Sequence, residues 1–359
     1  MAQQLNVGIV GFGMTAQVMH APFLKTNPGY NVRAAVERHD EKSKAFFEDI
    51  AVLKSLDALL QRDDIDLIII TTPNDSHFDY AKKAVLAGKH VVLEKPVTIT
   101  SADAAELVQL SRSTNKVISP FHNRRYVADF RTMQPIIQQH LLGNIHEFEG
   151  RFDRYRPEPK PAAWREELVP GSGVLYDLGP HLIDQALCLF GLPQAITADV
   201  RLQRPHARVD DYFELQLDYG FTKVTLKAGM LVREPGPRYL VHGTKGSFIK
   251  SGDDVQEALL KSGVLPTAGD WGFEPEEQYG LLHTEIDGEV LSKKVRSLNG
   301  HFGLYYQHLY NAITNGAPLR EKPEHGFNTI RLIELALQSS AAKKTISCDG
   351  LMDAEYPKD

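Results

Sequence analysis

The strongest constraint on the fold is an alternation of short apolar runs with helical patterns over the first 120 residues. Residues 5–10 (LNVGIV) are almost continuously apolar, which is typical of a strand buried on both faces. Similar runs stand at 30–36, 67–72, 90–94 and 116–119. Helical spacing separates them, as at 76–89 and at 101–115, where Ser101 is the expected N-cap. This alternation predicts a doubly wound parallel sheet.

The second part of the chain has a different pattern. Residues 212–220 and 223–232 alternate apolar with polar side chains, and 238–250 predict a hairpin that turns between Gly243 and Gly246. Such strands are typical of a mostly antiparallel sheet with one buried face. Helices are expected at about 129–142, 303–315 and 324–343.

A glycine-rich turn directly follows the first apolar run. Gly11, Gly13 and Ala16 form a G-x-G-x-x-A pattern between a predicted strand and a predicted helix. Gly11 permits the tight turn, Gly13 lets the main chain approach a pyrophosphate, and Ala16 keeps helix and strand close. The free N–H groups of the helix N-terminus then face the phosphates. The pattern predicts a dinucleotide-binding site.

Two adjacent residues after the second apolar run give opposite indications about the dinucleotide. Glu37 stands where an acid binds the ribose hydroxyls of NAD. Arg38 follows at once, and a guanidinium pairs with the 2′-phosphate of NADP. A solvated charged loop is the alternative for each residue. The sequence therefore leaves NAD and NADP open as cofactors.

Polar residues also follow the runs at 67–72 and 90–94. Because the carboxyl ends of parallel strands meet at one sheet edge, these residues are expected near the cofactor. They are Thr72, Pro73, Asn74, His77, Glu94 and Lys95. The ammonium of Lys95 is also suited to hydrogen-bond a substrate hydroxyl and help move its proton. A cis bond before Pro96 is one way to direct this lysine.

Residues 173–191 (GVLYDLGPHLIDQALCLFG) have leucines at helical spacing but contain Gly179 and Pro180, which a helix interior disfavours. Asp177 and His181 are four residues apart and share a helix face. His181 is the expected base, because imidazole titrates near neutrality. Asp177 is expected to bind a neighbouring hydroxyl and orient the imidazole. An internal hydrogen-bonded pair is the alternative, and no third ligand with suitable spacing supports a metal site.

The glycine and the proline of this helix have expected roles of their own. Pro180 lacks an N–H, so we expect the helix to bend there. Gly179 is expected to leave room for the nicotinamide or the substrate.

Charge and cysteine content exclude several classes of protein. Acidic residues outnumber basic ones by 46 to 40, for a net charge of −6, which argues against a nucleic-acid binder. Cys188 and Cys348 are too few for a disulfide framework, and no Cys/His array predicts a metal. The N-terminus has no basic signal region and no apolar run is long enough to span a bilayer, so a cytoplasmic protein without membrane partners is expected.

Length and pattern together predict two domains in the 359 residues. Residues 1–120 form the expected dinucleotide-binding Rossmann domain. Residues 121–359 form the expected substrate-binding α+β domain, whose large open sheet is expected to self-associate through its uncovered face.

Three motifs together resemble the Gfo/Idh/MocA oxidoreductase family over nearly the whole chain. They are GFGMTA at 11–16, E-K-P at 94–96 and D-x-x-x-H at 177–181. The segments FHNRRY, RFDRYRP, WREE and LYDLGPHLIDQALCLFGLP further resemble the branch that contains NADP-dependent scyllo-inositol dehydrogenase. NADP-using relatives in this branch tend to carry a small hydroxyl residue where Glu37 stands.

The resemblance implies reversible hydride transfer between NAD(P) and a carbon-bound hydroxyl of a sugar or polyol. It assigns the catalytic triad to Lys95, Asp177 and His181. It also implies a homodimer or homotetramer through the C-terminal sheet.

Further polar and aromatic side chains suit a pocket for a ring of hydroxyls. They are Asn123, Arg125, Arg154, Tyr155, Trp164 and Arg165. Packing, or an ion pair of Arg165 with Glu166 or Glu167, is the alternative.

Two other functions stay open on the same scaffold. One is a catalytically silent, dinucleotide-bound sensor or regulator, against which the joint presence of Lys95 and His181 argues. The other is an NAD-dependent glycosidase, in which oxidation at one carbon enables elimination.

Overall fold

The computed structural model describes residues 4–161 and 163–357, which fall into two compact units, each built from several segments of chain. The first unit comprises Met1–Tyr126, Val255–Trp271 and His301–Phe327. The second comprises Val127–Asp254, Gly272–Gly300 and Asn328–Asp359. Two later segments thus belong to the same unit as the predicted dinucleotide-binding domain.

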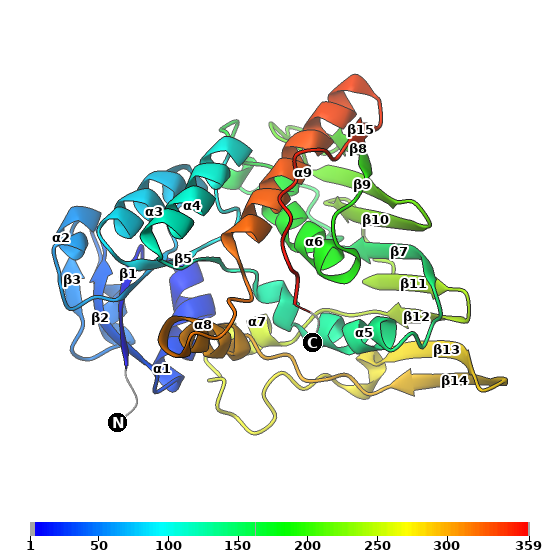
Figure 1. Ribbon diagram of the computed structural model, residues 1–359, viewed down its shortest axis with the longest axis horizontal. Helices are drawn as coiled ribbons and strands as arrows, with labels where there is room; N and C mark the ends of the chain where they lie inside the picture. The colour runs from blue at the N-terminus through cyan, green and yellow to red at the C-terminus, as the bar shows by residue number, and fades with distance from the viewer. Residues whose placement is uncertain (1–3, 162, 358–359) are drawn as a thin grey trace. The chain divides into compact units, whose positions relative to one another are not determined.

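The first unit contains a six-stranded, all-parallel sheet in the order β3-β2-β1-β4-β5-β6 (Figure 1). Its strands are β1 (Leu5–Val10), β2 (Tyr30–Val36), β3 (Ala51–Leu53), β4 (Leu67–Ile70), β5 (His90–Leu93) and β6 (Ile118–Pro120). The predicted parallel sheet is confirmed, and the order reverses between β1 and β4, where such sheets bind ligands. The short β3 has no counterpart in the sequence-based expectation.

The helices expected at 76–89, 101–115 and 303–315 are confirmed in the first unit, which contains further short helices. They are η1 (Ala16–His20), α1 (Ala21–Thr26), η2 (Lys42–Ala45), α2 (Leu56–Leu60), η3 (Asn74–Ser76), α3 (His77–Leu86), α4 (Ser101–Thr114), η4 (Asn123–Tyr126), α7 (Gln256–Lys261) and α8 (Gly303–Asn315). The predicted N-cap of α4 was wrong by one residue. Thr100 has extended dihedral angles, and its hydroxyl accepts the N–H of Asp103, whereas Ser101 is the first helical residue.

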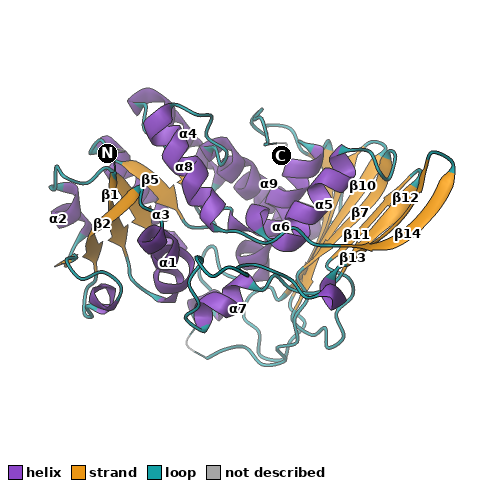
Figure 2. Cartoon of the chain, turned by 90° about the horizontal axis from the view of Figure 1, so that it is seen from below, coloured by secondary structure: helices purple, strands orange, loops and turns teal. Residues whose placement is uncertain are grey.

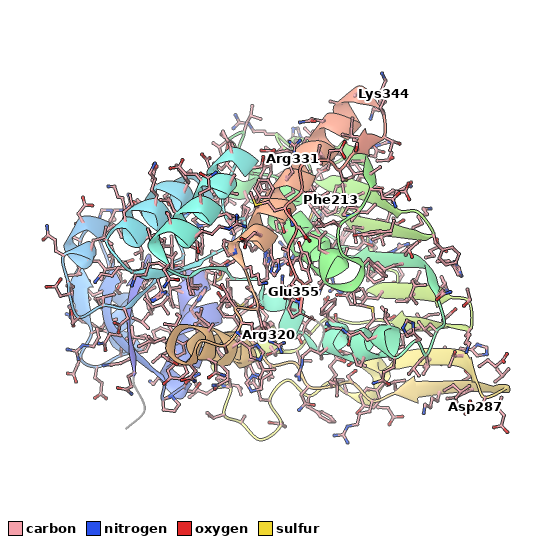
Figure 3. All side chains as sticks on the ribbon, in the orientation of Figure 1. Phe213, Asp287, Arg320, Arg331, Lys344 and Glu355 are labelled. Atoms are coloured by element: carbon pink, nitrogen blue, oxygen red, sulfur yellow. The ribbon has the colours of Figure 1, made fainter. Side chains whose placement is uncertain are left out.

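The second unit contains a nine-stranded sheet in the order β14-β13-β12-β11-β7-β10-β9-β8-β15. Its strands are β7 (Ile145–Arg151), β8 (Ala195–Arg201), β9 (Tyr212–Tyr219), β10 (Thr222–Gly229), β11 (Tyr239–Gly243), β12 (Gly246–Lys250), β13 (Gly280–Ile286), β14 (Glu289–Val295) and β15 (Ile346–Ser347). Every neighbouring pair is antiparallel except β7 and β10. Both the mostly antiparallel sheet and the β11–β12 hairpin are confirmed. Asp287 marks the tip of the β13–β14 hairpin (Figure 3).

Helices cover one face of this sheet (Figure 2). They are α5 (Ala128–Gln138), α6 (Val174–Phe190) and the part of α9 (Pro323–Ala342) that belongs to this unit, with η5 (Trp164–Glu166) and η6 (Glu276–Gln278) in loops. The inward side chains of β9 at Phe213, Leu215 and Leu217 are buried beneath α6. The predicted self-association through the opposite face stays a prediction. Among the described residues, no helix combines the length and the apolar character needed to cross a bilayer.

Candidate functional site

The glycine turn after β1 has the backbone that the sequence predicts. Gly11 has a φ of +83°, which strains any residue with a side chain. Its N–H donates to the carbonyl of Val36 at 3.1 Å, which places the turn beside the end of β2. Thr71 Oγ1 donates to the carbonyl of Gly11 at 2.7 Å and holds the turn from the end of β4. The threonine is a contributor that the sequence analysis missed.

The surroundings of the turn fit a pyrophosphate. A Cβ placed on Gly13 meets no atom within 4 Å, so the main chain there borders open space. Ala16 is fully buried, as close packing of helix on strand requires. The helix that begins at Met14 has N–H groups in its first turn with no carbonyl partner inside the helix. Free N–H groups beside open space are what a dinucleotide phosphate needs.

Glu37, at the end of β2, is turned inward. Its side chain accepts hydrogen bonds from the Lys42 N–H at 2.8 Å and from the N–H and hydroxyl of Ser43 at 3.0 and 2.5 Å. The residue is 6% exposed. These bonds make Glu37 the cap of the short η2 turn. Arg38 is exposed next to it.

The segment after β4 is bound to the segment after β5 through a buried histidine. One ring nitrogen of His77 lies 2.8 Å from the carbonyl oxygen of Pro96, and the other lies 2.9 Å from that of Thr72. Burial lowers the pKa of His77, and a neutral ring donates to one of the two carbonyls at a time. The other two predicted residues of this segment differ in exposure, since Asn74 is buried and Pro73 is exposed.

Glu94 and Lys95 follow β5 at the same sheet edge. The Lys95 N–H donates to Glu94 Oε2 at 3.1 Å, and the Lys95–Pro96 bond is cis. Burial acts to raise the pKa of Glu94. The hydrogen bond from His20 and the charge of Lys95 outweigh it, so the pKa of this carboxyl lies below its ordinary value. Glu94 is therefore a buried carboxylate directly before the predicted catalytic lysine.

The N-terminus of α6 is capped from another loop. Gly173, the N-cap residue, has a φ of +90° and no side chain to offer. Asp210 takes over this role: its carbonyl accepts the N–H of Val174 at 2.9 Å and its carboxylate accepts that of Leu175 at 2.7 Å. A Cβ on Gly173 would lie 2.1 Å from the Asp210 carboxylate, so this position requires glycine.

Asp210 makes the stability of the protein pH-dependent. Burial raises the pKa of its carboxyl to about 6 from 3.8. Between these values the folded protein holds a proton that the unfolded chain has lost, so this group's contribution to stability falls as pH rises. Asp210→Asn removes this dependence and keeps an oxygen for the Leu175 N–H. The free energy of unfolding of the variant relative to wild type is expected to rise from pH 4 to pH 7, by at most about 3 kcal/mol. Thermal melts across that range measure it, and a difference that does not change with pH contradicts the assignment.

The two predicted catalytic residues of α6 have different surroundings. The Asp177 carboxylate forms an ion pair with Nε of Arg165 at 3.2 Å. His181 is 7% exposed, and its ring centroid lies 6.1 Å from that of Phe152. Asp177 thus has a cationic partner, and His181 lies beside one aromatic ring.

The predicted role of Gly179 was wrong. The residue is buried, and a Cβ added there would meet Leu175 Cδ1 at 3.1 Å and Ile183 Cδ1 at 3.9 Å. The missing side chain therefore makes room for leucine and isoleucine of the same helix and not for a ligand. Helix α6 continues through Pro180 from Val174 to Phe190.

Two predicted aromatic pocket residues of the second unit, Trp164 and Tyr155, each lie against an arginine. The Arg165 guanidinium lies 4.5 Å from the ring centroid of Trp164, and that of Arg233 lies 3.8 Å from the ring of Tyr155. The alternative ion pair between Arg165 and Glu166 does not form, because Glu166 pairs with the buried Arg204 at 2.6 Å. Arg165 is therefore directed to Asp177 instead.

Asn123 and Arg125 both lie in η4 of the first unit and are buried. The Arg125 guanidinium donates to the carbonyl of Arg320 at 2.9 Å and contacts His325 Nδ1 at 3.0 Å. These bonds tie η4 to the segment before α9 and to the first turn of α9.

The structure groups the predicted residues by unit. In the first unit it gathers the glycine turn with Thr72, His77, Glu94 and Lys95 at one sheet edge. In the second unit it gathers Trp164, Arg165 and Asp177 over the start of α6. Among the described residues, no group of three or more His, Cys, Asp or Glu side chains is arranged to hold a metal.

Comparison with known proteins identifies two family models that match the chain. A family model described as "Oxidoreductase family, NAD-binding Rossmann fold" matches residues 5–122, and one described as "Oxidoreductase family, C-terminal alpha/beta domain" matches residues 135–348. The chain is 39% identical over 342 residues to scyllo-inositol 2-dehydrogenase (NADP(+)) IolW of Bacillus subtilis, covering 95% of each protein. It is 38% identical over 347 residues to the uncharacterized oxidoreductase YdgJ of Escherichia coli, covering 96% of this chain and 99% of the relative. The solved structure of yvaA from Bacillus subtilis aligns with a TM-score of 0.93 at 39% identity, covering 97% of this chain and 99% of the other.

Proposed function

Because the chain belongs to the Gfo/Idh/MocA oxidoreductase family, we propose that it transfers a hydride between NAD(P) and a carbon-bound hydroxyl of a polyol or sugar. The observation that carries this proposal is Lys95, which directly follows a buried carboxylate at the sheet edge that bears the glycine turn. Asp177 and His181 on α6 supply the other groups that this chemistry needs.

Each of the three residues has one role in the proposed reaction. His181 accepts the proton of the reacting hydroxyl, because hydride removal from an alcohol leaves a carbonyl only if that proton also departs. Lys95 donates a hydrogen bond to the same oxygen and stabilises the charge that develops on it. Asp177, held by Arg165, binds an adjacent hydroxyl. When bound, NAD(P) supplies the hydride acceptor.

The side chains around α6 support a polyol or sugar as substrate. Trp164 offers an aromatic surface, and the Trp164 and Asp177 side chains share Arg165 as a partner. Fixed polar groups beside aromatic faces suit a ring that carries several hydroxyls. The similarity to scyllo-inositol 2-dehydrogenase (NADP(+)) IolW supports the inositols as the first compounds to test.

We also propose NADP as the preferred cofactor. The Glu37 carboxylate already accepts three hydrogen bonds from residues 42 and 43, which leaves it poorly placed for ribose hydroxyls. Arg38 is exposed at the end of β2, next to the glycine turn. A guanidinium there is the natural partner of a 2′-phosphate.

Replacing Arg38 with alanine is therefore expected to weaken NADPH binding by about 10- to 100-fold, the worth of a charge-assisted bidentate contact. The Kd for NADH is expected to stay within about twofold, because NADH has no 2′-phosphate. Both constants come from fluorescence titration of the protein without substrate. Arg33→Ala, on the exposed side of the same strand, is the matched control. Equal losses for both cofactors would show that Arg38 acts on the whole site and not on the phosphate.

The function itself is tested by an absorbance screen at the reduced-nicotinamide band. The purified protein is mixed with NAD⁺ or NADP⁺ and with an inositol isomer, glucose, another aldose or a glycoside. Lactones of the aldoses are mixed with the protein and NADH or NADPH. Turnover with at least one polyol or sugar is expected, faster with NADP⁺. Cleavage of a glycoside with no net NAD(P)H would identify a glycosidase, and cofactor binding without any turnover would identify a sensor.

A further inference from the structure

Three buried polar side chains from distant parts of the first unit form one hydrogen-bonded chain behind Lys95. His20 Nε2 lies 2.8 Å from Glu94 Oε1, and His20 Nδ1 lies 2.5 Å from the Tyr306 hydroxyl. His20 and Tyr306 are fully buried, and Glu94 is 8% exposed. The other carboxylate oxygen, Oε2, accepts the N–H of Lys95. The chain therefore ends on the backbone of the proposed catalytic lysine.

The chemistry of the groups determines the direction of the chain. The Glu94 carboxylate only accepts, so His20 Nε2 carries a hydrogen and donates to it. In a neutral ring, Nδ1 then accepts, and the Tyr306 hydroxyl is its donor. Each polar atom in the chain thus has a partner of the correct kind, which is the condition for burying such a network without a large free-energy penalty.

The local backbone and the neighbouring rings hold the imidazole in one orientation. His20 is the last residue of the π-helical turn η1, an irregularity that is frequent at functional sites. The ring of Phe121 lies 4.3 Å from the His20 ring, centroid to centroid. Tyr306 is held in turn by its carbonyl, which accepts the Tyr30 hydroxyl at 2.7 Å. Helix α1, which follows η1, packs on α8, which carries Tyr306 (Figure 1).

A buried chain of this kind is a poor way to gain stability. Burying a carboxylate and an imidazole costs desolvation free energy, and apolar side chains of equal volume often serve stability as well or better. The hydrogen-bonded chain does, however, fix both oxygens of Glu94. It thereby also fixes the direction in which the polypeptide leaves β5.

We propose that His20, Glu94 and Tyr306 are positioning residues that hold the backbone at Lys95, so that its ammonium is presented to the substrate oxygen in one place. This inference rests on the proposed function, in which Lys95 acts on the substrate. His77 adds to this support on the other side of Lys95 in the sequence, because its ring contacts the carbonyl of Pro96. None of the three residues needs to touch the substrate.

The first test needs no activity. Hydrogen–deuterium exchange is followed in peptides covering residues 93–98, with and without NADPH. The Lys95 N–H is protected by its bond to Glu94. His20→Ala is therefore expected to speed exchange of this N–H by tenfold or more, and Tyr306→Phe by a smaller factor. His20→Gln keeps an N–H that can reach Glu94 and is expected to restore protection. His90→Ala is the matched control: it removes a ring that accepts the Val117 N–H at 3.0 Å at the opposite end of β5.

The second test separates positioning from structure by kinetics, with scyllo-inositol and NADP⁺ as the probe or whichever polyol the screen identifies. His20→Ala is expected to lower kcat by about 10- to 100-fold, the cost of a misplaced catalytic group, with KM and the Kd for NADPH within about threefold. In a Lys95→Met background, His20→Ala is expected to lower kcat by less than about twofold, because the ammonium that His20 helps to position is gone. His20→Gln is expected to recover most of kcat.

The outcomes distinguish this inference from the proposed function. Unchanged exchange at 93–98 in both His20→Ala and Tyr306→Phe overturns the inference, whatever the substrate is. Full additivity of His20→Ala with Lys95→Met also overturns it. Absence of turnover by the wild-type protein with every compound of the screen counts against the proposed function and leaves the exchange result to decide the positioning chain.

Discussion

Replacing Lys95 with methionine is expected to lower kcat by about 10³-fold, while the Kd for NADPH changes by less than about threefold. Methionine keeps the length and apolar stem of lysine but offers no hydrogen to the substrate oxygen. That oxygen gains negative charge as its proton leaves, so the lost bond is one that strengthens in the transition state. The backbone N–H of residue 95 still donates to Glu94, and the site behind the lysine should therefore remain intact.

Steady-state kinetics with the substrate found by the screen, together with fluorescence titration of NADPH, measure the two effects. Lys82→Met is the matched control, since Lys82 is a half-buried lysine on α3 whose ion-pair partner is Glu106. The control is expected to keep the wild-type rate. If Lys95→Met and Lys82→Met turn over equally fast, the catalytic assignment of Lys95 fails.

Replacing His181 with alanine is expected to lower kcat by about 10²- to 10⁴-fold in the direction of alcohol oxidation, the usual worth of a general base. The cofactor Kd is expected to stay close to the wild-type value. Added imidazole is expected to recover part of the rate, because the alanine leaves a space of the size of the lost ring. That recovery distinguishes a missing base from a misfolded helix.

The matched control is His146→Ala, which removes an exposed histidine on β7. Its rate should equal that of the wild type with and without imidazole. A wild-type kcat for His181→Ala contradicts the role of His181 as the base. A low rate that imidazole does not raise, together with a lowered melting temperature, contradicts it as well.

Most of the fold follows from short-range patterns. The bounds of β1 and β2 match the apolar runs 5–10 and 30–36, because a strand buried on both faces leaves a continuous apolar signal. The sequence pattern indicates β9 equally plainly, since Phe213, Leu215 and Leu217 alternate with polar residues. The three-residue β3 is too short to leave such a signal. Its place in the sheet depends on pairing with β2.

The proposed site residues come from equally local patterns. The Gly11 turn, Lys95 after β5, and the placement of Asp177 and His181 four residues apart on α6 each involve only a few residues. The inward turn of Glu37 left no such pattern, because its donors are supplied by the conformation of residues 42 and 43. The error at Gly179 has a similar origin: the sequence gives a glycine, but only packing decides that Leu175 and not a ligand occupies the space beside it.

The sequence by itself determined the two sheets, the glycine turn and the chemical groups that the proposed reaction needs, since each depends on residues within one strand, helix or turn. Only the tertiary structure decided which groups support them. His20 reaches Glu94 across 74 residues and Tyr306 across 286, and Asp210 caps α6 from 35 residues away. No local pattern predicts such contacts, because the two partners become neighbours only when the chain has folded. They depend on burial, which makes an unpaired polar group costly and so leaves these side chains one arrangement in which every atom is satisfied.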